Sequence, residues 1–205
     1  MSRSRRLTPS AIADAALRVG DREGPQAMTM RRIAADIGCD PMALYRHFAD
    51  REALLDAVAD LALADAADPD PRAIWEDRLR AIVTAIRSAA LRHPGIAAHV
   101  AARPPLGPNG HRLGIAMLAA LAQAGLPPPT AVRAAQTLVA YVASSLGMAV
   151  RAGKRDARWS QVSRTLGELP GSPPGEELLI AGSDEQFDYG LHLLIAGIRV
   201  EATSS

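Results

Sequence analysis

The sequence predicts an all-α protein. Hydrophobic residues make up 48% of the 205-residue chain, whereas aromatic residues make up only 3%. Alanine is abundant and β-branched residues are sparse, a composition that favours helices over strands. Breaks that contain proline or glycine divide the chain into amphipathic stretches with helical periodicity. The length fits one medium domain or a small domain joined to a larger one.

The first helix is expected to begin at Thr8-Pro9, a capping residue followed by a proline at the first helical position. The apolar residues that follow share one helical face: Ile12, Ala15, Ala16 and Val19. Gly20 and the Gly24-Pro25 pair are expected to end this helix.

Two further helices and a short one between them are expected before residue 66. Thr29 can cap the second helix, and Gly38 is a typical residue for its end. Asp40-Pro41 marks the start of a short third helix, and Asp50 can cap a fourth that runs to about residue 62.

The segment 67–71 contains two prolines and is expected to join two packed parts of the chain. We therefore predict an N-terminal domain at 1–66 and a C-terminal domain at 67–205. In the second domain, the apolar pattern predicts helices at 72–93, 96–102, 111–125, 130–150 and 184–200. The segment 151–183 is rich in glycine, proline, serine and charge, so we expect it to be mobile, with at most one short helix.

One spacing within the first domain predicts a helix-turn-helix. Ala34 is followed by Gly38 four residues later and by Leu44 after six more. A small residue lets the helices cross, the glycine supplies a left-handed turn, and the apolar residue fixes the crossing. The same spacing occurs in helical hairpins that have no contact with DNA, so it leaves both interpretations open.

The composition of the short third helix favours DNA binding. If Leu44 and Phe48 face the core, the residues left on the sides and the outer face are Met42, Ala43, Tyr45, Arg46 and His47. Such side chains can contact thymine methyl groups, guanine or phosphate oxygens. Thr29, Met30 and Arg31 offer backbone N–H groups, a hydroxyl and a cation at the start of the preceding helix, which suits a phosphate.

The segment "TMRRIAADIGCDPMALYRHFADREALLDAV" resembles the DNA-binding segment of the TetR (tetracycline repressor) family of transcriptional regulators. The resemblance combines T-x-R-x-[IV]-A, a glycine at the turn, L-Y-x-H-F and D-[RK]-x-x-L-L, and covers about residues 8 to 65. "RHPGIA" and "FDYGLHLLIAGI" are similar to the ligand-binding and dimerisation domain of the tetracycline-repressor-like branch.

This resemblance implies a three-helix DNA-binding head on a helical body, and a homodimer that reads a palindromic operator in double-stranded DNA. It also implies release of the DNA when a small-molecule effector binds. The positions that match the family's phosphate contacts are Thr29, Arg31, Tyr45, His47 and Arg51. The positions that match its base-reading edge are Pro41, Met42 and Ala43. This edge is largely apolar, so Arg46 or the basic arm at Arg3, Arg5 and Arg6 is expected to carry more of the readout.

The helical body offers residues for a mostly apolar pocket with a few polar anchors. The residues predicted to bind the effector are Trp75, His111, Met117, Gln136, Tyr141, Ser144, Ser145 and Met148. Each could instead belong to the core or the surface. The helices at 130–150 and 184–200 are expected to form the subunit interface as a four-helix bundle, with an intramolecular core as the alternative.

Other classes of function lack sequence support. The spacings of His93, His99, His111 and His192 do not match a metal site, and no cofactor or catalytic motif is present. A single cysteine, Cys39, excludes an intramolecular disulfide, and no apolar run is long enough for a membrane span. We therefore expect a cytoplasmic protein that is not an enzyme. The residues alone also fit a helical small-molecule-binding or partner-interaction protein that does not bind DNA.

Overall fold

The computed structural model describes residues 7–151, 157–168 and 180–204, and every regular element in these ranges is helical, which confirms the predicted all-α class. The N-terminal part contains α1 (Pro9–Glu23), η1 (Pro25–Ala27), α2 (Met30–Ile37), α3 (Pro41–Tyr45) and α4 (Arg51–Ala62). The C-terminal part contains α5 (Trp75–Leu91), α6 (Pro94–Ala102), α7 (Pro108–Gln123), α8 (Pro128–Arg151), α9 (Ala157–Gly167) and α10 (Asp184–Ser204).

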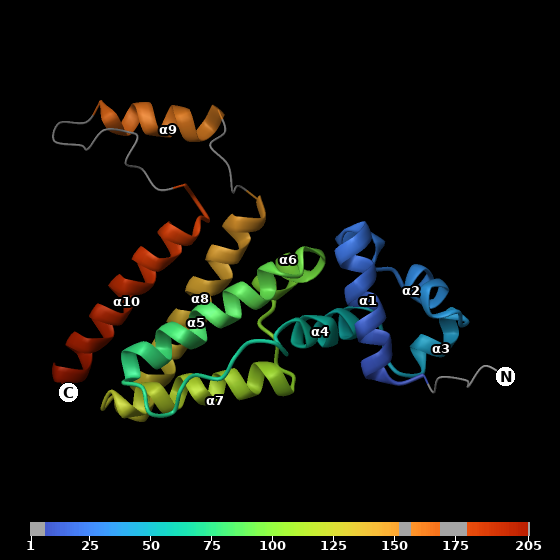
Figure 1. The fold of residues 1–205 in the computed structure, drawn as a ribbon, viewed down its shortest axis with the longest axis horizontal. Coiled ribbons are helices and arrows are strands. Elements are labelled where there is room, and N and C mark those ends of the chain that lie inside the picture. The colour runs from blue at the N-terminus through green and yellow to red at the C-terminus, as the bar shows by residue number, and fades with distance from the viewer. Residues whose placement is uncertain (1–6, 152–156, 169–179, 205) are drawn as a thin grey trace.

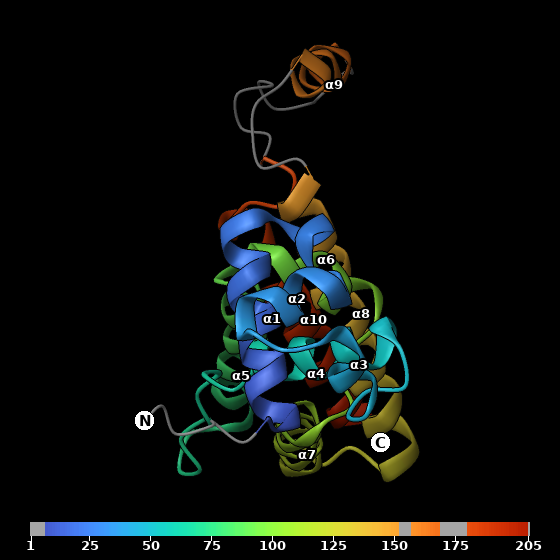
Figure 2. The same cartoon turned by 90° about the vertical axis from the view of Figure 1, so that its right-hand side faces the viewer.

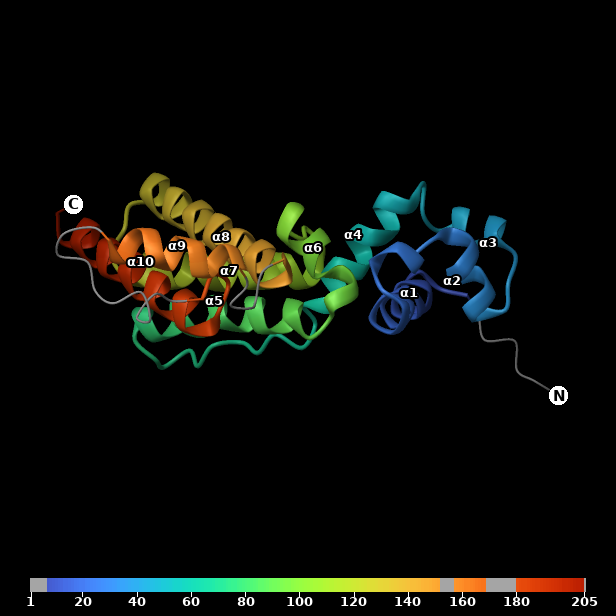
Figure 3. The same ribbon diagram turned by 90° about the horizontal axis from the view of Figure 1, so that it is seen from above.

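The molecule is elongated, with α1, α2 and α3 at one end (Figure 1). We call α1–α4 the head and α5–α10 the body. Helix α4 extends from the head to the body, where it contacts α6 and α7 (Figure 3). Figure 2 looks onto the end formed by α1, α2 and α3, and shows α9 standing apart from the rest of the body.

The predicted caps define the helices of the head. In each case a side-chain oxygen accepts a hydrogen bond from a backbone N–H in the first helical turn, at 2.7–3.2 Å, and the capping residues are Thr8, Thr29, Asp40 and Asp50. Gly38 ends α2 in the left-handed conformation, with φ of 79°, which favours glycine. These four caps and the Gly38 turn therefore act as predicted.

The prediction that Gly20 ends the first helix is wrong. Helix α1 continues to Glu23, and Gly24 is its C-terminal cap. Gly20 is buried where α6 crosses α1, and an added Cβ on Gly95 of α6 would lie 2.3–2.6 Å from backbone atoms of Gly20. The two glycines thus allow the backbones of head and body to approach each other closely.

Several predicted boundaries in the body also differ from the structure. Pro108 and Pro128 were predicted to lie in loops, yet they begin α7 and α8, because proline fits the first turn of a helix. Helix α5 begins at Trp75 rather than at residue 72, and α10 continues to Ser204. The predicted mobile segment 151–183 contains α9, while residues 152–156 and 169–179 lie outside the described residues.

Within the described residues, a hydrophobic core runs continuously from the head into the body. Leu44 is fully buried and Phe48 is nearly so, as the sequence predicts for the inner side of α3 and the turn after it. Because Leu44 is locked in the core, the rest of α3 keeps a fixed orientation relative to α2.

Candidate functional site

The outer surface of α3 presents hydrogen-bonding and apolar side chains to solvent. Met42 is 64% exposed and Tyr45 is 46% exposed. Arg46 and His47 are also exposed, whereas Pro41 and Ala43 are half-buried at the start of the helix. The structure therefore brings the predicted base-reading edge and the predicted phosphate contacts of α3 onto one surface.

The N-terminus of α2 lies beside this surface, and the cation Arg31 lies in the first turn of α2. Thr29 is exposed, and its Oγ1 accepts a hydrogen bond from the Arg32 backbone N–H at 3.2 Å. The Thr29 hydroxyl hydrogen remains able to donate to an anion. Arg31 is exposed next to it, so the helix N-terminus and the guanidinium can act on the same phosphate.

The neighbouring arginines 31 and 32 have different roles in the structure. Arg32 Nε donates to Glu23 Oε2 at 2.9 Å, and this bond holds the pKa of Glu23 below its usual range. The same bond raises the pKa of Arg32. Arg32 therefore ties α2 to α1, whereas Arg31 points to the outer surface, a difference that the sequence pattern alone does not reveal.

Arg51 has a structural contact in addition to its predicted role. Its Nε donates to the backbone oxygen of Met28 at 2.9 Å, although the side chain remains partly exposed. Met28 immediately precedes Thr29, the cap of α2. The first residue of α4 therefore positions the start of α2, and its remaining N–H groups lie at the surface of the head.

The body contains a small cavity of about 80 Å³ among α5, α6, α7 and α8, which is partly open to solvent and which we call the interior cavity. The lining includes Ile86, Leu113, Met117, Val142 and Leu146, and no lining side chain is charged. A surface hollow of about 500 Å³ over α6, α7 and α8 shares the lining residues Pro104, Val139 and Ala143 with this cavity. The hollow therefore adjoins the cavity.

Two of the eight predicted effector residues lie at these cavities, since Met117 lines the interior cavity and Gln136 lines the hollow. The other six do not line either cavity. His111 and Ser144 are exposed, and Trp75 and Met148 are partly buried elsewhere in the body. The lining residues that the sequence analysis missed include Val139, Val142 and Leu146, whose spacing along α8 would have identified them as one helical face.

Tyr141 and Ser145 lie at the interface between α5, α8 and α10. The Tyr141 ring stacks on Phe187 with 5.6 Å between centroids, and its hydroxyl donates to the Phe187 backbone oxygen at 2.8 Å. Arg87, which is buried, donates from Nε to Ser145 Oγ at 3.0 Å and from Nη2 to the Gly182 backbone oxygen at 2.8 Å. These contacts hold the start of α10 against α8.

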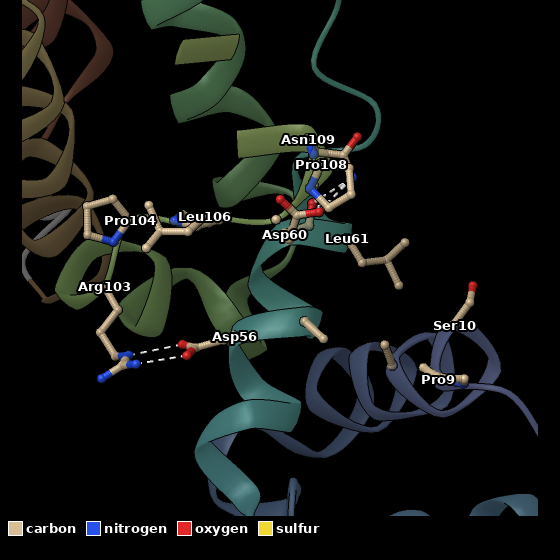
Figure 4. Close-up of a pocket in the computed structure, with 14 residues that line it drawn as sticks. Pro9, Ser10, Asp56, Asp60, Leu61, Arg103, Pro104, Leu106, Pro108 and Asn109 are labelled. Carbon is tan, nitrogen blue, oxygen red and sulfur yellow. Dashed lines mark hydrogen bonds and ion pairs between the residues drawn. The ribbon is translucent and has the colours of Figure 1, made fainter. Parts of the chain in front are cut away.

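A groove of about 750 Å³ lies where the head meets the body, between α1, α4 and the segment 103–109 (Figure 4). Arg103 donates from Nε and Nη2 to the two carboxylate oxygens of Asp56 in α4, at 3.0 and 2.8 Å. His99 Nε2 lies 2.9 Å from Asp56 Oδ1. The hydrogen bonds from Arg103 and then His99 lower the pKa of Asp56 to about 2, so this carboxylate stays ionised and ties α4 to the end of α6.

Two of the histidines considered as metal ligands lie within hydrogen-bonding distance of aspartates. His93 Nδ1 lies 2.7 Å from Asp21 Oδ2 in α1, and His99 contacts Asp56. Within the described ranges, no cluster of three or more potential metal ligands is found. Among the same residues, none of the helices combines the length and the hydrophobicity that a membrane span requires.

Comparisons with known proteins assign both parts of the chain. Residues 12–58 match the model of the TetR family of bacterial regulatory proteins, and residues 68–202 match the tetracycline repressor-like C-terminal domain. The class A tetracycline repressor of transposon 1721 from Escherichia coli is 30% identical over 205 residues, which is 94% of this chain and 91% of the relative.

Solved structures show the same arrangement of helices. Apo ActR from Streptomyces coelicolor superposes with a TM-score of 0.82 at 28% identity, covering 96% of this chain and 98% of ActR. BioQ with its double-stranded DNA operator superposes with a TM-score of 0.68 at 25% identity, covering 95% of this chain and 99% of BioQ. The chain belongs to the TetR family, whose members are DNA-binding transcriptional regulators and not enzymes, and it carries a tetracycline-repressor-like C-terminal domain.

Proposed function

We propose that this regulator is a homodimeric repressor that binds a palindromic operator and releases it when a small molecule occupies the body. The observation that carries the proposal is the pairing of an exposed α3 surface with an apolar cavity reached from the surface. ActR has been solved with actinorhodin, and BioQ with its DNA operator, so both ligand classes occur among similar structures. We place the domain division at 66/67 and the site of action in the cytoplasm, where bacterial DNA is found.

Recognition of the operator combines phosphate contacts with an apolar edge. In the proposed complex, the DNA backbone is held by the α2 N-terminus with Thr29 and Arg31, by Tyr45 of α3, and by His47 in the turn that follows α3, with Arg51 beside them. The edge formed by Pro41, Met42 and Ala43 contacts thymine methyl groups, and Arg46 reaches guanine or phosphate. Readout through DNA shape accompanies this apolar edge.

A gel shift separates this proposal from a helical protein that does not bind DNA. Duplexes selected with the full chain from random sequence should contain an inverted repeat with half-sites one helical turn, about 34–36 Å, apart or a multiple of this distance. Loss of the shifted band when nonspecific duplex is added in excess would contradict specific binding.

We expect Arg31→Ala to weaken operator binding and to reduce the slope of log affinity against log salt by about 0.9, because one phosphate contact is lost. The matched control is Arg92→Ala, which removes an exposed arginine at the end of α5. A salt titration of operator affinity measures both slopes. An unchanged slope in Arg31→Ala would remove this residue from the interface.

Tyr45→Phe is a complementary variant that removes only a hydroxyl. It should cost about 0.5–1.5 kcal/mol of operator binding free energy without a change in salt slope, because a neutral hydrogen bond to phosphate releases no counterion. Because Tyr45 is exposed, we expect the substitution to leave folding stability unchanged, so that weaker operator binding reports the lost hydrogen bond.

The lining of the interior cavity supports a neutral, mostly apolar effector. Burying a charged molecule against uncharged, apolar side chains would cost its hydration without a compensating partner. At about 80 Å³ the cavity is smaller than the roughly 300–1,000 Å³ typical of ligand pockets, so the effector also occupies the hollow or enlarges the cavity.

We expect Gly114→Leu to abolish the effector response while leaving operator binding intact. Gly114 lines the cavity at an exposed position of α7, and a Cβ added there meets no atom within 4 Å. The larger side chain can therefore fill space at this wall of the cavity without displacing α7, and leucine has the higher helix propensity.

The readout is the release of operator duplex by a compound that raises the melting temperature of the wild type, chosen from a panel of neutral polycyclic molecules. Ala119→Leu is the control, because Ala119 is exposed on the same helix outside both cavity linings. Release that is equal in Gly114→Leu and the wild type would place the effector elsewhere.

A further inference from the structure

Asp60 is a buried carboxylate at the groove between head and body, and neither the proposed DNA contacts nor the lining of the interior cavity includes it. It lies in the last turn of α4 and is 7% exposed. Its Oδ1 accepts a hydrogen bond from the Gly110 backbone N–H at 2.8 Å, and its Oδ2 accepts from the Asn109 backbone N–H at 3.2 Å. Asn109 Nδ2 donates to Asp60 Oδ2 and to the Asp60 backbone oxygen, both at 3.1 Å (Figure 4).

These bonds make Asp60 the cap of a helix to which it does not belong. Helix α7 begins at Pro108, and its own N-cap residue, Gly107, supplies no side-chain hydrogen bond. The first-turn N–H groups of α7 therefore find their acceptor in α4, and the carboxylate lies at the positive end of the α7 dipole. A Cβ on Gly107 would lie 2.5–2.8 Å from the Asp60 carboxylate atoms, so the chain passes directly against this group.

The first turns of α7 both line the interior cavity and hydrogen-bond to Asp60. Gly110 donates its N–H to Asp60 and also lines the interior cavity, followed on α7 by Leu113, Gly114 and Met117. One turn along, Arg112 Nη2 donates to the Ala66 backbone oxygen at 3.0 Å, and its guanidinium pairs with Asp68. The start of α7 is thus bonded both to the end of α4 and to the segment that follows it.

The other end of α4 reaches the DNA-binding surface. Arg51, its first residue, donates to the Met28 backbone oxygen next to the cap of α2. A displacement of α7 by a molecule in the cavity therefore moves Gly110, Asp60 and α4 as a connected series, and α4 carries the motion to α2. Buried hydrogen bonds resist stretching, because an unpaired carboxylate or N–H in the interior is costly.

We propose that Asp60 is the positioning residue that couples the effector cavity to the DNA-binding head, through its bonds to the N-terminus of α7. This role rests on the proposed function, because it requires both an operator and an effector. Coupling is reciprocal, so operator binding at the head must also change the stability of α7.

Asp56 provides a matched comparison one turn earlier on α4. Its bonds run to His99 and Arg103 at the end of α6, and its side chain is 42% exposed. Asp56→Asn therefore removes a charge from the same helix and disturbs a different contact with the body. A role specific to Asp60 predicts different results for the two substitutions.

The test is hydrogen exchange of the full chain with and without a duplex selected by the wild type. In the wild type and in Asp56→Asn, the duplex should slow exchange in the α7 peptide 111–123 by about fivefold to 150-fold, the range of typical coupling energies. In Asp60→Asn, the duplex should still slow exchange in the head peptide 30–45 but leave the α7 peptide unchanged. Asn109→Ala breaks the same contact from the α7 side and should give the same result if Asp60→Asn does not fold.

The outcomes separate the two proposals. Duplex-dependent slowing of α7 in Asp60→Asn or Asn109→Ala that equals the wild-type value would overturn the role of Asp60 and leave the repressor function standing. Absence of α7 slowing in a wild type that binds the duplex would also overturn the coupling alone. A wild type that selects no duplex would overturn the proposed function and the coupling with it.

Discussion

A Leu193→Asp variant is expected to be monomeric and to bind operator duplex about 10²–10⁴-fold more weakly than the wild type, because the advantage of two linked heads is lost. Leu193 is 53% exposed on α10 and shares a helical face with Tyr189, Gly197 and Val200. Tyr189 and Val200 are also exposed, so this face presents apolar side chains along the helix. A carboxylate placed there would have to be desolvated when two copies associate.

The shape of this surface supports pairing through α8 and α10. A groove between the two helices is lined by Thr130, Thr137, Leu193 and Gly197, among others. Small residues in such a groove let a second pair of helices approach closely, as in a four-helix bundle. Arg87 and the stacked rings of Tyr141 and Phe187 fix α10 against α8, which keeps the surface preformed in each copy.

Light scattering after size-exclusion chromatography measures the oligomeric state, and a gel shift with full-site and half-site duplexes measures binding. The control is Ile115→Asp, which places a carboxylate at an equally exposed apolar position on α7, away from the α8–α10 groove. A Leu193→Asp protein that remains dimeric would move the interface elsewhere. A monomer with wild-type operator affinity would contradict the need for two heads.

Local signals in the sequence predicted the head well because its structure depends on neighbours along the chain. A cap such as Asp40 bonds an N–H two residues away, and the Gly38 turn closes within its own helix end. The division of α3 into a buried Leu44 and an exposed surface follows from helical periodicity alone. The exposed side of α3 could therefore be predicted from the sequence.

The contacts between head and body could not be predicted in the same way. Asp60 looks like an ordinary polar residue of an amphipathic helix, and its partners Asn109 and Gly110 lie about 50 residues further along the chain. From the sequence, Arg87 would likewise be assigned to the surface of α5. In the structure it is buried, and its hydrogen-bond partners lie between 58 and 97 positions further along the chain. Their roles depend on how helices are placed in space, which no local pattern specifies.

The effector list shows a related limit. Tyr141 and Ser145 belong to the predicted effector-binding residues, whereas in the structure their polar atoms contact other parts of the protein. The cavity is instead lined by aliphatic residues of α8 such as Val139 and Val142, which the sequence pattern would assign to the core. The polarity of a side chain alone does not distinguish a residue that contacts a ligand from one that hydrogen-bonds within the protein.

Gly95→Ala is expected to lower the free energy of unfolding by about 1–3 kcal/mol, because the added methyl group would be forced into the backbone of α1. Its Cβ would lie 2.3–2.6 Å from backbone atoms of Gly20, and backbone cannot move aside as a flexible side chain can. The higher helix propensity of alanine, worth up to about 1 kcal/mol, works against this loss without removing the clash. Helices α1 and α6 would have to separate, which would tilt the head relative to the body and weaken operator binding as well.

Thermal unfolding and operator titration measure the two effects, and for a chain of this size each 1 kcal/mol corresponds to about 2–4 °C in melting temperature. Gly114→Ala is the matched control, since the same substitution in α7 meets no atom within 4 Å and should leave the melting temperature equal or higher. If Gly95→Ala were as stable as Gly114→Ala, the close approach of α1 and α6 would not hold the head in place. If it lost stability but kept full operator affinity, the two heads would find their spacing without this contact, and α4 alone would set their position.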